Sequence, residues 1–214
     1  MPLIKTEQYD QHTKILIWHI TESNEYFEKK LSKHFTSPYP WDHMIPKRRR
    51  EYLASRYILQ KALPPHLSVA DYVKDQNGAP RIHHSPLYIG ISHCEKYTAC
   101  IVSNRRAGCD IEIYQNRILR LADRFMTPKD QKWAEAGDPV KRTHLMWGIK
   151  ESSYKTWAKR GIDWIKDIHV DSISEKNSGK GKIKGRIGKK AHEIHYHGEY
   201  QYFDDFIFVW TLEV

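Results

Sequence analysis

The chain has 214 residues, of which 40% are hydrophobic and 12% aromatic. This composition excludes disordered and low-complexity proteins, and no apolar run approaches the roughly 18 residues that span a membrane. The first residues are polar rather than signal-like, and the three cysteines are an odd number placed close together in sequence. We therefore expect a cytoplasmic protein with reduced thiols and no membrane partner.

The formal net charge of +9 attracts polyanions. Nucleic acid, anionic lipid, a phosphorylated small molecule and an acidic protein are all compatible with it. Both halves of the chain share the excess of Lys and Arg, which argues against a basic tail on a neutral body.

The first half of the chain alternates between apolar runs and helical spacing. Residues 15–20 form an apolar run rich in β-formers and predict a strand. Apolar residues at three- and four-residue steps predict a helix over residues 22–35, capped by Ser23 or Asn24. The same spacing predicts a stronger helix over residues 47–63. A turn at residues 75–80 and strands at residues 87–92 and 98–102 complete this half.

The second half predicts one long helix and a β-rich tail. We expect a strand at residues 109–113, short helices at residues 117–125 and 128–135, and a helix from residue 141 to about residue 160, ended by Gly161. Four more strands are expected at residues 168–173, 183–187, 193–200 and 206–212. The fold class is therefore α/β or α+β. We divide the chain into an N-terminal half, residues 1–105, and a C-terminal half, residues 106–214.

One acidic motif lies on a predicted strand, Gly108-Cys109-Asp110-Ile111-Glu112. Side chains of a strand repeat every two residues, so Asp110 and Glu112 share one face. Two carboxylates this close repel each other unless a proton or a cation lies between them, and Mg²⁺ prefers such oxygen ligands. The alternative is an amphipathic edge strand with a solvated acidic face.

A second motif lies on the predicted long helix and runs from Trp147 to Lys155 with the pattern W-G-I-K-E-S-S-Y-K. Glu151 and Lys155 are four residues apart and therefore neighbours on one helix face. They place a carboxylate, for a proton or a metal, beside an ammonium that can neutralise phosphate. Taken alone, such a pair is more often an ordinary surface ion pair.

Two further pairs are weaker signals. Ser92 and His93 come at the end of a predicted strand, where a hydroxyl and an imidazole can reach a ligand. Arg49 and Arg56 are seven residues apart on the predicted helix and share a face, from which two guanidiniums can hold a phosphate. Each pair alone is explained as well by a solvated surface.

In chain order, these motifs closely resemble the 4′-phosphopantetheinyl transferases of the surfactin-synthetase-activating type. The two family signatures, G-x-D-x-E and W-x-x-K-E-x-x-x-K, are both complete, and Glu112 and Glu151 are 39 residues apart. The resemblance extends from about Arg48 to Lys155. It implies two similar α/β halves packed as a pseudo-dimer, with coenzyme A and the active site in the cleft between them.

The resemblance also implies residue roles. Asp110, Glu112 and Glu151 match the family's Mg²⁺ site. Lys155 matches the lysine at the pyrophosphate, and Lys150 matches the basic residue just before the glutamate. Glu151, or a base that it positions, would take the proton of the attacking serine. Lys155 would stabilise charge on the departing phosphate.

The remaining roles concern the nucleotide part of coenzyme A. Ser92 and His93 match the family's pair near the nucleotide, and Arg56, with Arg49, matches the helix that meets the 3′-phosphate. Ala79, in Gly78-Ala79-Pro80, stands where the family usually has a lysine, so a basic side chain is missing there. Asp130 stands where the family often has a glutamate, and its role is left open.

The implied reaction moves 4′-phosphopantetheine from coenzyme A to a serine of an acyl or peptidyl carrier protein, depends on Mg²⁺, and releases 3′,5′-ADP. Carrier proteins of this kind are usually acidic, which suits a basic enzyme. We expect a monomer that serves a carrier whose pathway the sequence does not name.

An alternative of another class rests on residues 176–190, which carry seven Lys and Arg, no acid and several glycines. They could be a flexible arm of a non-catalytic nucleic-acid-binding protein. We favour an exposed hairpin or loop with a solvated basic face, and no nucleic-acid partner, because such a protein would not need two acidic signatures.

Overall fold

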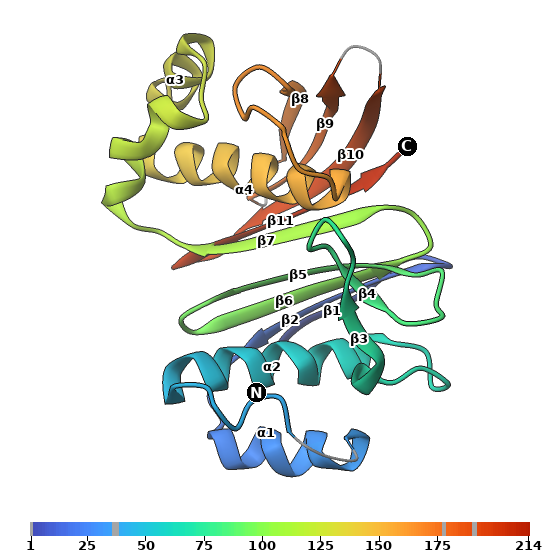
Figure 1. Ribbon diagram of the computed structural model, residues 1–214. Coiled ribbons are helices and arrows are strands. Elements are labelled where there is room, and N and C mark those ends of the chain that lie inside the picture. The colour runs from blue at the N-terminus through green and yellow to red at the C-terminus, as the bar shows by residue number, and fades with distance from the viewer. Residues whose placement is uncertain (1, 36–38, 177–178, 190–191) are drawn as a thin grey trace. The chain divides into compact units, whose positions relative to one another are not determined.

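A computed structural model describes residues 2–35, 39–176, 179–189 and 192–214. The chain divides into two compact units, Met1–Asn104 and Arg105–Val214. This division falls one residue before the predicted one. Each unit combines a β-sheet with a long helix (Figure 1), so the predicted α/β class is confirmed.

Unit 1 is built on a four-stranded antiparallel sheet of order β1-β2-β6-β5. Strands β3 and β4 form a separate two-stranded antiparallel sheet, and the predicted turn connects them. The strands are β1 (Leu3–Asp10), β2 (Thr13–His19), β3 (Tyr72–Lys74), β4 (Pro80–Ile82), β5 (Tyr88–Cys94) and β6 (Tyr97–Ser103). The helices are α1 (Asn24–Leu31), α2 (Pro46–Ala62) and the short 3₁₀ turns η1 (Ser32–His34) and η2 (Val69–Asp71).

The core of unit 1 forms where α2 packs on one face of this sheet and α1 packs against α2 (Figure 1). Leu53, Ile58 and Leu59 of α2 are fully buried against sheet residues such as Leu16 and Ile89. Ser23 caps α1 by accepting a hydrogen bond from the backbone N–H of Tyr26, as predicted. The predicted helices and strands of this half are confirmed, and β1, β3 and β4 are additional strands.

Unit 2 is built on a five-stranded antiparallel sheet of order β7-β11-β10-β9-β8. Its long helix packs on the face of β7 and β11, where Leu145, Ile149, Ile207 and Val209 are buried together. The strands are β7 (Ala107–Ile113), β8 (Ile168–Lys176), β9 (Lys180–Lys189), β10 (His192–Tyr202) and β11 (Phe206–Glu213). The helices are η3 (Asn116–Arg124), α3 (Pro128–Glu135) and α4 (Pro139–Trp157).

The end of α4 differs from the prediction. The helix stops at Trp157, where Ala158 takes a left-handed conformation with φ of 56°, rather than at Gly161. The segment that follows, residues 158–167, returns over α4 before β8 begins, and we call it the strap. Asp163 and Asp167 tie it into compact turns through hydrogen bonds to backbone N–H groups within it.

The basic run is largely strand β9, which pairs with β8 on one side and β10 on the other. Within residues 180–189 it is therefore an interior strand and not a flexible arm. Residues 177, 178 and 190 of the run lie outside the described residues. Lys180, Lys182 and Lys184 are exposed on one face, while Arg186 forms ion pairs with two acids of the neighbouring strands, Asp171 and Glu193.

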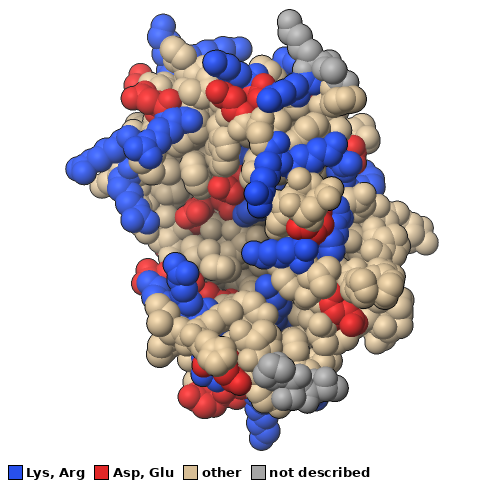
Figure 2. Space-filling view, in the orientation of Figure 1, with Lys and Arg blue, Asp and Glu red and all other residues tan. Residues whose placement is uncertain are grey.

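Two surface properties bear on the possible partners. On the face drawn in Figure 2, basic and acidic side chains are interspersed over both units. No helix among the described residues is both long enough and apolar enough to cross a bilayer.

Candidate active site

The acidic motif of β7 faces α4. Asp110 and Glu112 pair in register with Val209 and Ile207 of β11, and Val209 packs beneath α4. Asp110 is 3% exposed. β7 is an edge strand, but it does not carry a solvated acidic face, because Asp110 is buried under α4 and Glu112 is half-buried. The alternative of an ordinary amphipathic edge is wrong.

Two glycines allow this close approach of strand and helix. A Cβ on Gly108 would overlap the carbonyl oxygen of Ser152 and come within 2.8 Å of Lys155 Cβ. A Cβ on Gly148 would lie 2.7 Å from Val209 Cγ2. Gly108 therefore lies where α4 passes over β7, and Gly148 lies where α4 packs on β11, the strand paired with β7. The two motifs are brought together by this packing.

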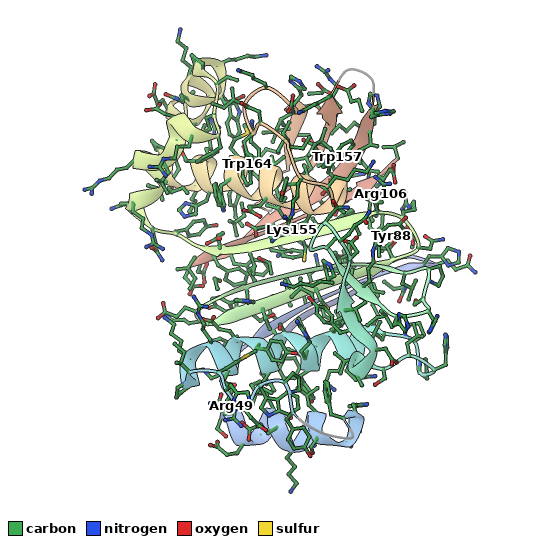
Figure 3. All side chains as sticks on the ribbon, in the orientation of Figure 1. Arg49, Tyr88, Arg106, Lys155, Trp157 and Trp164 are labelled. Atoms are coloured by element: carbon green, nitrogen blue, oxygen red, sulfur yellow. The ribbon has the colours of Figure 1, made fainter. Side chains whose placement is uncertain are left out.

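Lys155 joins the carboxylates of the two motifs. Its Nζ lies 2.8 Å from Asp110 Oδ1 and 3.8 Å from Glu151 Oε2, and it donates to the carbonyl of Cys109 at 2.9 Å. The side chain reaches from α4 toward β7 (Figure 3). Glu151 and Lys155 thus do more than pair along the helix, since the ammonium is shared with the buried Asp110.

The charges of this cluster are unequally compensated. Burial, and then the nearby Asp110, raise the pKa of Glu112 to about 7, although Lys155 and a hydrogen bond with the Trp147 side chain act against them. Burial and Asp110 also raise the pKa of Glu151, against the effect of Lys155. Burial alone would lower the pKa of Lys155, but Asp110 and Glu151 raise it above its ordinary value. The ammonium is therefore firmly charged, while the carboxylates remain in excess.

A divalent cation fits this donor set by charge and chemistry. Three carboxylates around the ammonium of Lys155 leave an excess of two negative charges. Carboxylate oxygens are the ligands that Mg²⁺ prefers. Within the described ranges no three His, Cys, Asp or Glu side chains are already spaced to hold an ion. The fit therefore rests on charge and donor type.

Lys150 has a different environment from the one its motif suggested. Its side chain is 1% exposed, and Nζ donates to the backbone carbonyls of Trp164 at 2.5 Å and Ile168 at 3.2 Å. Burial lowers its pKa to about 8, against the effects of Asp130 and Asp163. The ammonium binds the strap and the start of β8, so the geometry gives no support to the predicted contact with coenzyme A.

Arg56 is buried in unit 1 and sandwiched between two aromatic rings. Its guanidinium carbon lies 4.4 Å from the centroid of Tyr52 and 3.7 Å from that of Tyr72. The residue is 7% exposed, Nη1 donates to Ser55 Oγ, and Nε has no hydrogen-bond partner within the described part of the chain. A buried cation of this kind, with no carboxylate ion-paired to it among the described residues, is suited to an anion.

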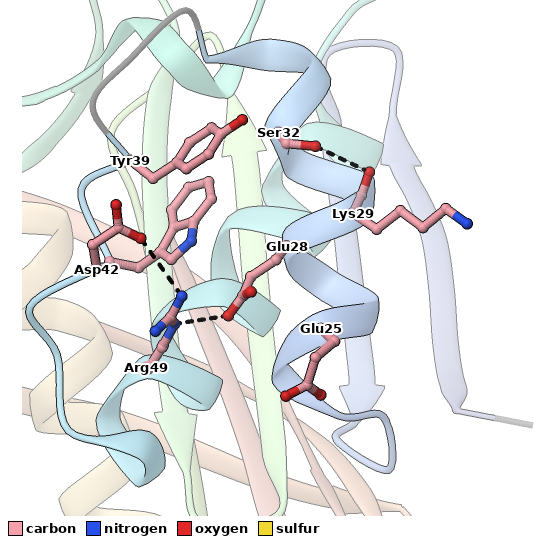
Figure 4. Close-up of a pocket in the computed structure, with 8 residues that line it drawn as sticks. Glu25, Glu28, Lys29, Ser32, Tyr39, Asp42 and Arg49 are labelled. Atoms are coloured by element: carbon pink, nitrogen blue, oxygen red, sulfur yellow. Dashed lines mark hydrogen bonds and ion pairs between the residues drawn. The ribbon is translucent and has the colours of Figure 1, made fainter.

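Arg49 is engaged elsewhere, although it shares a helix with Arg56. Its Nε lies 2.7 Å from Glu28 Oε1, and its Nη2 lies 3.5 Å from Asp42 Oδ1. It lines a small pocket between α1 and α2 with the stacked rings of Tyr39 and Trp41 (Figure 4). The structure therefore does not bring Arg49 and Arg56 together around one phosphate.

Ser92 and His93 both lie in β5 and, as neighbours in a strand, point to opposite faces of the sheet. Ser92 is buried, and His93 is exposed with Nδ1 3.6 Å from Glu51 Oε2 of α2. The predicted pair is thus split between two faces of an edge strand.

The two positions that departed from the family pattern have clear local roles. Asp130 closes the capping box of α3, because its carboxylate accepts from the backbone N–H of Thr127 while Thr127 accepts from that of Asp130. Ala79 lies in the β3–β4 turn. Beside it, the Arg81 guanidinium packs on the Tyr88 ring at 4.2 Å and pairs with Asp75 at 3.6 Å.

Comparisons with known proteins match both units. A model of the 4′-phosphopantetheinyl transferase superfamily matches residues 106–210, and a model of the 4′-phosphopantetheinyl transferase N-terminal domain matches residues 39–103. The chain belongs to the 4′-phosphopantetheinyl transferase superfamily. The resemblance drawn from the two motifs is thereby confirmed.

Two curated relatives of this superfamily are similar to the chain. The 4′-phosphopantetheinyl transferase gsp of Aneurinibacillus migulanus is 26% identical over 124 residues, which are 56% of this chain and 52% of that protein. A 4′-phosphopantetheinyl transferase of Bacillus subtilis is 28% identical over 110 residues, 50% of this chain and 47% of that protein. The chain thus matches about half the length of these relatives.

Sequence reasoning missed two aromatic residues of this transferase-superfamily unit. The Trp147 side chain hydrogen-bonds Glu112, and the ring of Trp164 in the strap lies 5.1 Å from that of Trp147. Trp147 belongs to the quoted motif, so its position was visible, but its partner on β7 was not. Nothing in the sequence marks Trp164 as a neighbour of α4.

The substitution Gly108→Ala tests the packing that brings the motifs together. The added methyl group has no space against Ser152 and Lys155, and we expect it to destabilise unit 2 by about 1–3 kcal/mol. Urea denaturation measures this. The control is Gly137→Ala, whose methyl group meets only the end of the flexible Arg142 side chain and should cost less than about 0.5 kcal/mol. Equal effects of the two substitutions would contradict the packing argument.

Proposed function

We propose that this protein transfers 4′-phosphopantetheine from coenzyme A to a serine of an acyl or peptidyl carrier protein and releases 3′,5′-ADP. The observation that carries the proposal is the cluster in which Lys155 bridges Asp110 and Glu151 beside Glu112. Its residues are those of the two signatures, on a chain of the transferase superfamily. The two curated relatives are named 4′-phosphopantetheinyl transferases.

The reaction is a displacement at phosphorus. The serine oxygen forms a bond to the phosphorus next to pantetheine, the bond from that phosphorus to the oxygen of 3′,5′-ADP breaks, and the serine proton passes to a base. We assign the base to Glu151, or to a group that Glu151 positions, because its raised pKa favours proton uptake. Lys155 would neutralise charge on the departing phosphate.

Asp110, Glu112 and Glu151 would hold Mg²⁺. The ion, when bound, would offset the charges of the carboxylates and of the pyrophosphate, which otherwise repel each other. Asp110 would keep its hydrogen bond from Lys155 and so fix the position of the ammonium. Positioning and charge neutralisation then supply most of the rate enhancement.

Residues of unit 1 would bind the nucleotide end of coenzyme A. Arg56 is the strongest candidate for the 3′-phosphate, because it is a buried guanidinium that its tyrosines orient without neutralising it. Ser92 and His93 are proposed to contact the nucleotide from β5. We give Arg49 a lesser part, since Glu28 and Asp42 already neutralise it. We propose a cytoplasmic monomer whose partner is an acidic carrier.

The proposal is tested by incubating apo-carrier proteins of fatty-acid, polyketide and nonribosomal-peptide pathways with fluorescently labelled coenzyme A, Mg²⁺ and the protein. Label should appear on at least one carrier and be lost when its serine is replaced by alanine. If no carrier is labelled, while the protein purifies with tightly bound nucleic acid and coenzyme A gives no protection against heat, the binding-protein alternative replaces the transferase.

A further inference from the structure

Four side chains of unit 2 form a connected path that ends on Glu112. Lys150 binds the carbonyl of Trp164, the Trp164 ring packs on Trp147, and the Trp147 side chain hydrogen-bonds Glu112. Trp164 lies over α4 in the strap, between the helix and β8 (Figure 3). The path therefore runs from the strap to one carboxylate of the candidate site.

The ring contacts fix Trp147 from two sides. Trp164 packs on it with centroids 5.1 Å apart and planes 31° apart, and the buried Phe125 meets it edge-on at 5.1 Å and 74°. An indole has one polar atom, Nε1, which only donates. With the ring held in this way, its N–H stays beside the Glu112 carboxylate, on which it acts as a hydrogen-bond donor.

The strap is fixed from below by Lys150. A buried ammonium that donates to two backbone carbonyls, those of Trp164 and Ile168, holds both ends of a short segment on α4. The Asp163 turn and the Tyr154 ring, 5.9 Å from that of Trp164, complete the support. Lys150 and Glu151 are adjacent, so the same turn of α4 supplies a site carboxylate and the anchor of the strap.

We propose that the strap is a positioning element for the metal site, in which Lys150 and Trp164 hold the Trp147 N–H on Glu112 and so fix that carboxylate for Mg²⁺. Trp147, Trp164 and Lys150 are positioning residues that touch neither substrate nor metal. Groups that orient metal ligands in this way typically change metal affinity 10- to 100-fold when they are removed. The inference rests on the proposed function.

The test measures metal binding directly. Mn²⁺, which takes the same oxygen ligands as Mg²⁺, is titrated into the protein saturated with coenzyme A, and free Mn²⁺ is read by electron paramagnetic resonance. Trp147→Phe keeps the ring and removes the donor, and it should weaken Mn²⁺ binding by roughly 10-fold. The matched control is Trp157→Phe at the end of the same helix. Trp157 is not among the groups that shift the Glu112 pKa, so this variant should leave the Mn²⁺ affinity unchanged.

The strap is tested by Trp164→Ala and Lys150→Met, each of which should also weaken Mn²⁺ binding by roughly 10-fold, while Trp164→Phe retains most of it. Because Trp164 acts through Trp147, the double variant Trp147→Phe/Trp164→Ala should bind Mn²⁺ about as weakly as either single variant. Circular dichroism checks folding. If Trp164→Ala does not fold, the Mn²⁺ affinities of Trp147→Phe and Trp164→Phe still test the proposal.

The inference would be overturned if Trp147→Phe bound Mn²⁺ as tightly as the wild type. It would also be overturned if the loss of Mn²⁺ affinity in the double variant equalled the product of the losses in the two single variants. If Trp147→Phe weakens Mn²⁺ binding but Trp164→Ala and Lys150→Met do not, the strap has no role in positioning Trp147. These results are distinct from failure of the proposed function, in which the wild type itself neither binds Mn²⁺ in the presence of coenzyme A nor modifies a carrier.

Discussion

Lys155→Met should destabilise the metal-free protein by about 3 kcal/mol and abolish transfer. Removing one partner of a buried ion pair costs about 3–5 kcal/mol, because an uncompensated charge remains. We expect the lower end, since the Lys155 side chain is 27% exposed and water screens part of the loss. Asp110, which is almost fully buried, loses the hydrogen bond at 2.8 Å.

The same variant should respond unusually to Mg²⁺. Without the ammonium, nothing offsets the repulsion among the three carboxylates, so a divalent cation has more repulsion to relieve when it binds. Thermal unfolding with and without Mg²⁺ should therefore show a larger rise in Tm for Lys155→Met than for the wild type. The control is Lys159→Met, just beyond the helix, whose ammonium lies over the Trp157 ring. A Mg²⁺ response of Lys155→Met no larger than that of the control would contradict the cluster as described.

Glu112→Gln and Asp110→Asn should both lower transfer by roughly 100-fold or more, but they should change stability in opposite directions. Asp110→Asn removes the charged partner of Lys155 and should cost about 1.5–3 kcal/mol. Glu112→Gln removes a carboxylate that its neighbours disfavour and should stabilise the metal-free protein at pH 8 by on the order of 1–2 kcal/mol.

The gain from Glu112→Gln should depend on pH. The pKa of Glu112 is about 7 in the folded protein, against an ordinary value of 4.5. Between these values the unfolded chain has released the proton and the folded chain retains it, so the stability of the wild type falls as pH rises. Chemical denaturation should therefore give equal stabilities near pH 4.5 and a growing advantage for Glu112→Gln toward pH 8. An advantage that is the same at both pH values would contradict the assigned cause.

The sequence predicted the parts of the site that depend on local periodicity. Asp110 and Glu112 share a face because side chains of a strand repeat every two residues. Glu151 and Lys155 are neighbours because residues four apart lie on the same face of a helix. That the two pairs meet was implied by resemblance alone. The reason for the meeting is Gly108, whose missing side chain matters only because α4 passes over it.

Other features depended on tertiary contacts that no local pattern carries. The resemblance gave Lys150 a role in binding coenzyme A, yet its ammonium is buried and donates to the carbonyls of Trp164 in the strap and Ile168 in β8. Strand β1 was missed because its residues are mostly exposed or half-exposed, and its pairing with β2 defines it. The basic run looked unbalanced in sequence, but Asp171 and Glu193 approach it only across the sheet.

The central claim is most directly tested by intact-mass spectrometry of an apo-carrier protein after incubation with coenzyme A, Mg²⁺ and the protein. We predict a gain equal to one phosphopantetheine on the wild-type carrier. The gain should disappear with a chelator and with the variants Asp110→Asn and Glu112→Gln at matched concentrations. A carrier that gains the same mass with the variants as with the wild type would contradict the site, and no gain on any carrier class would contradict the function.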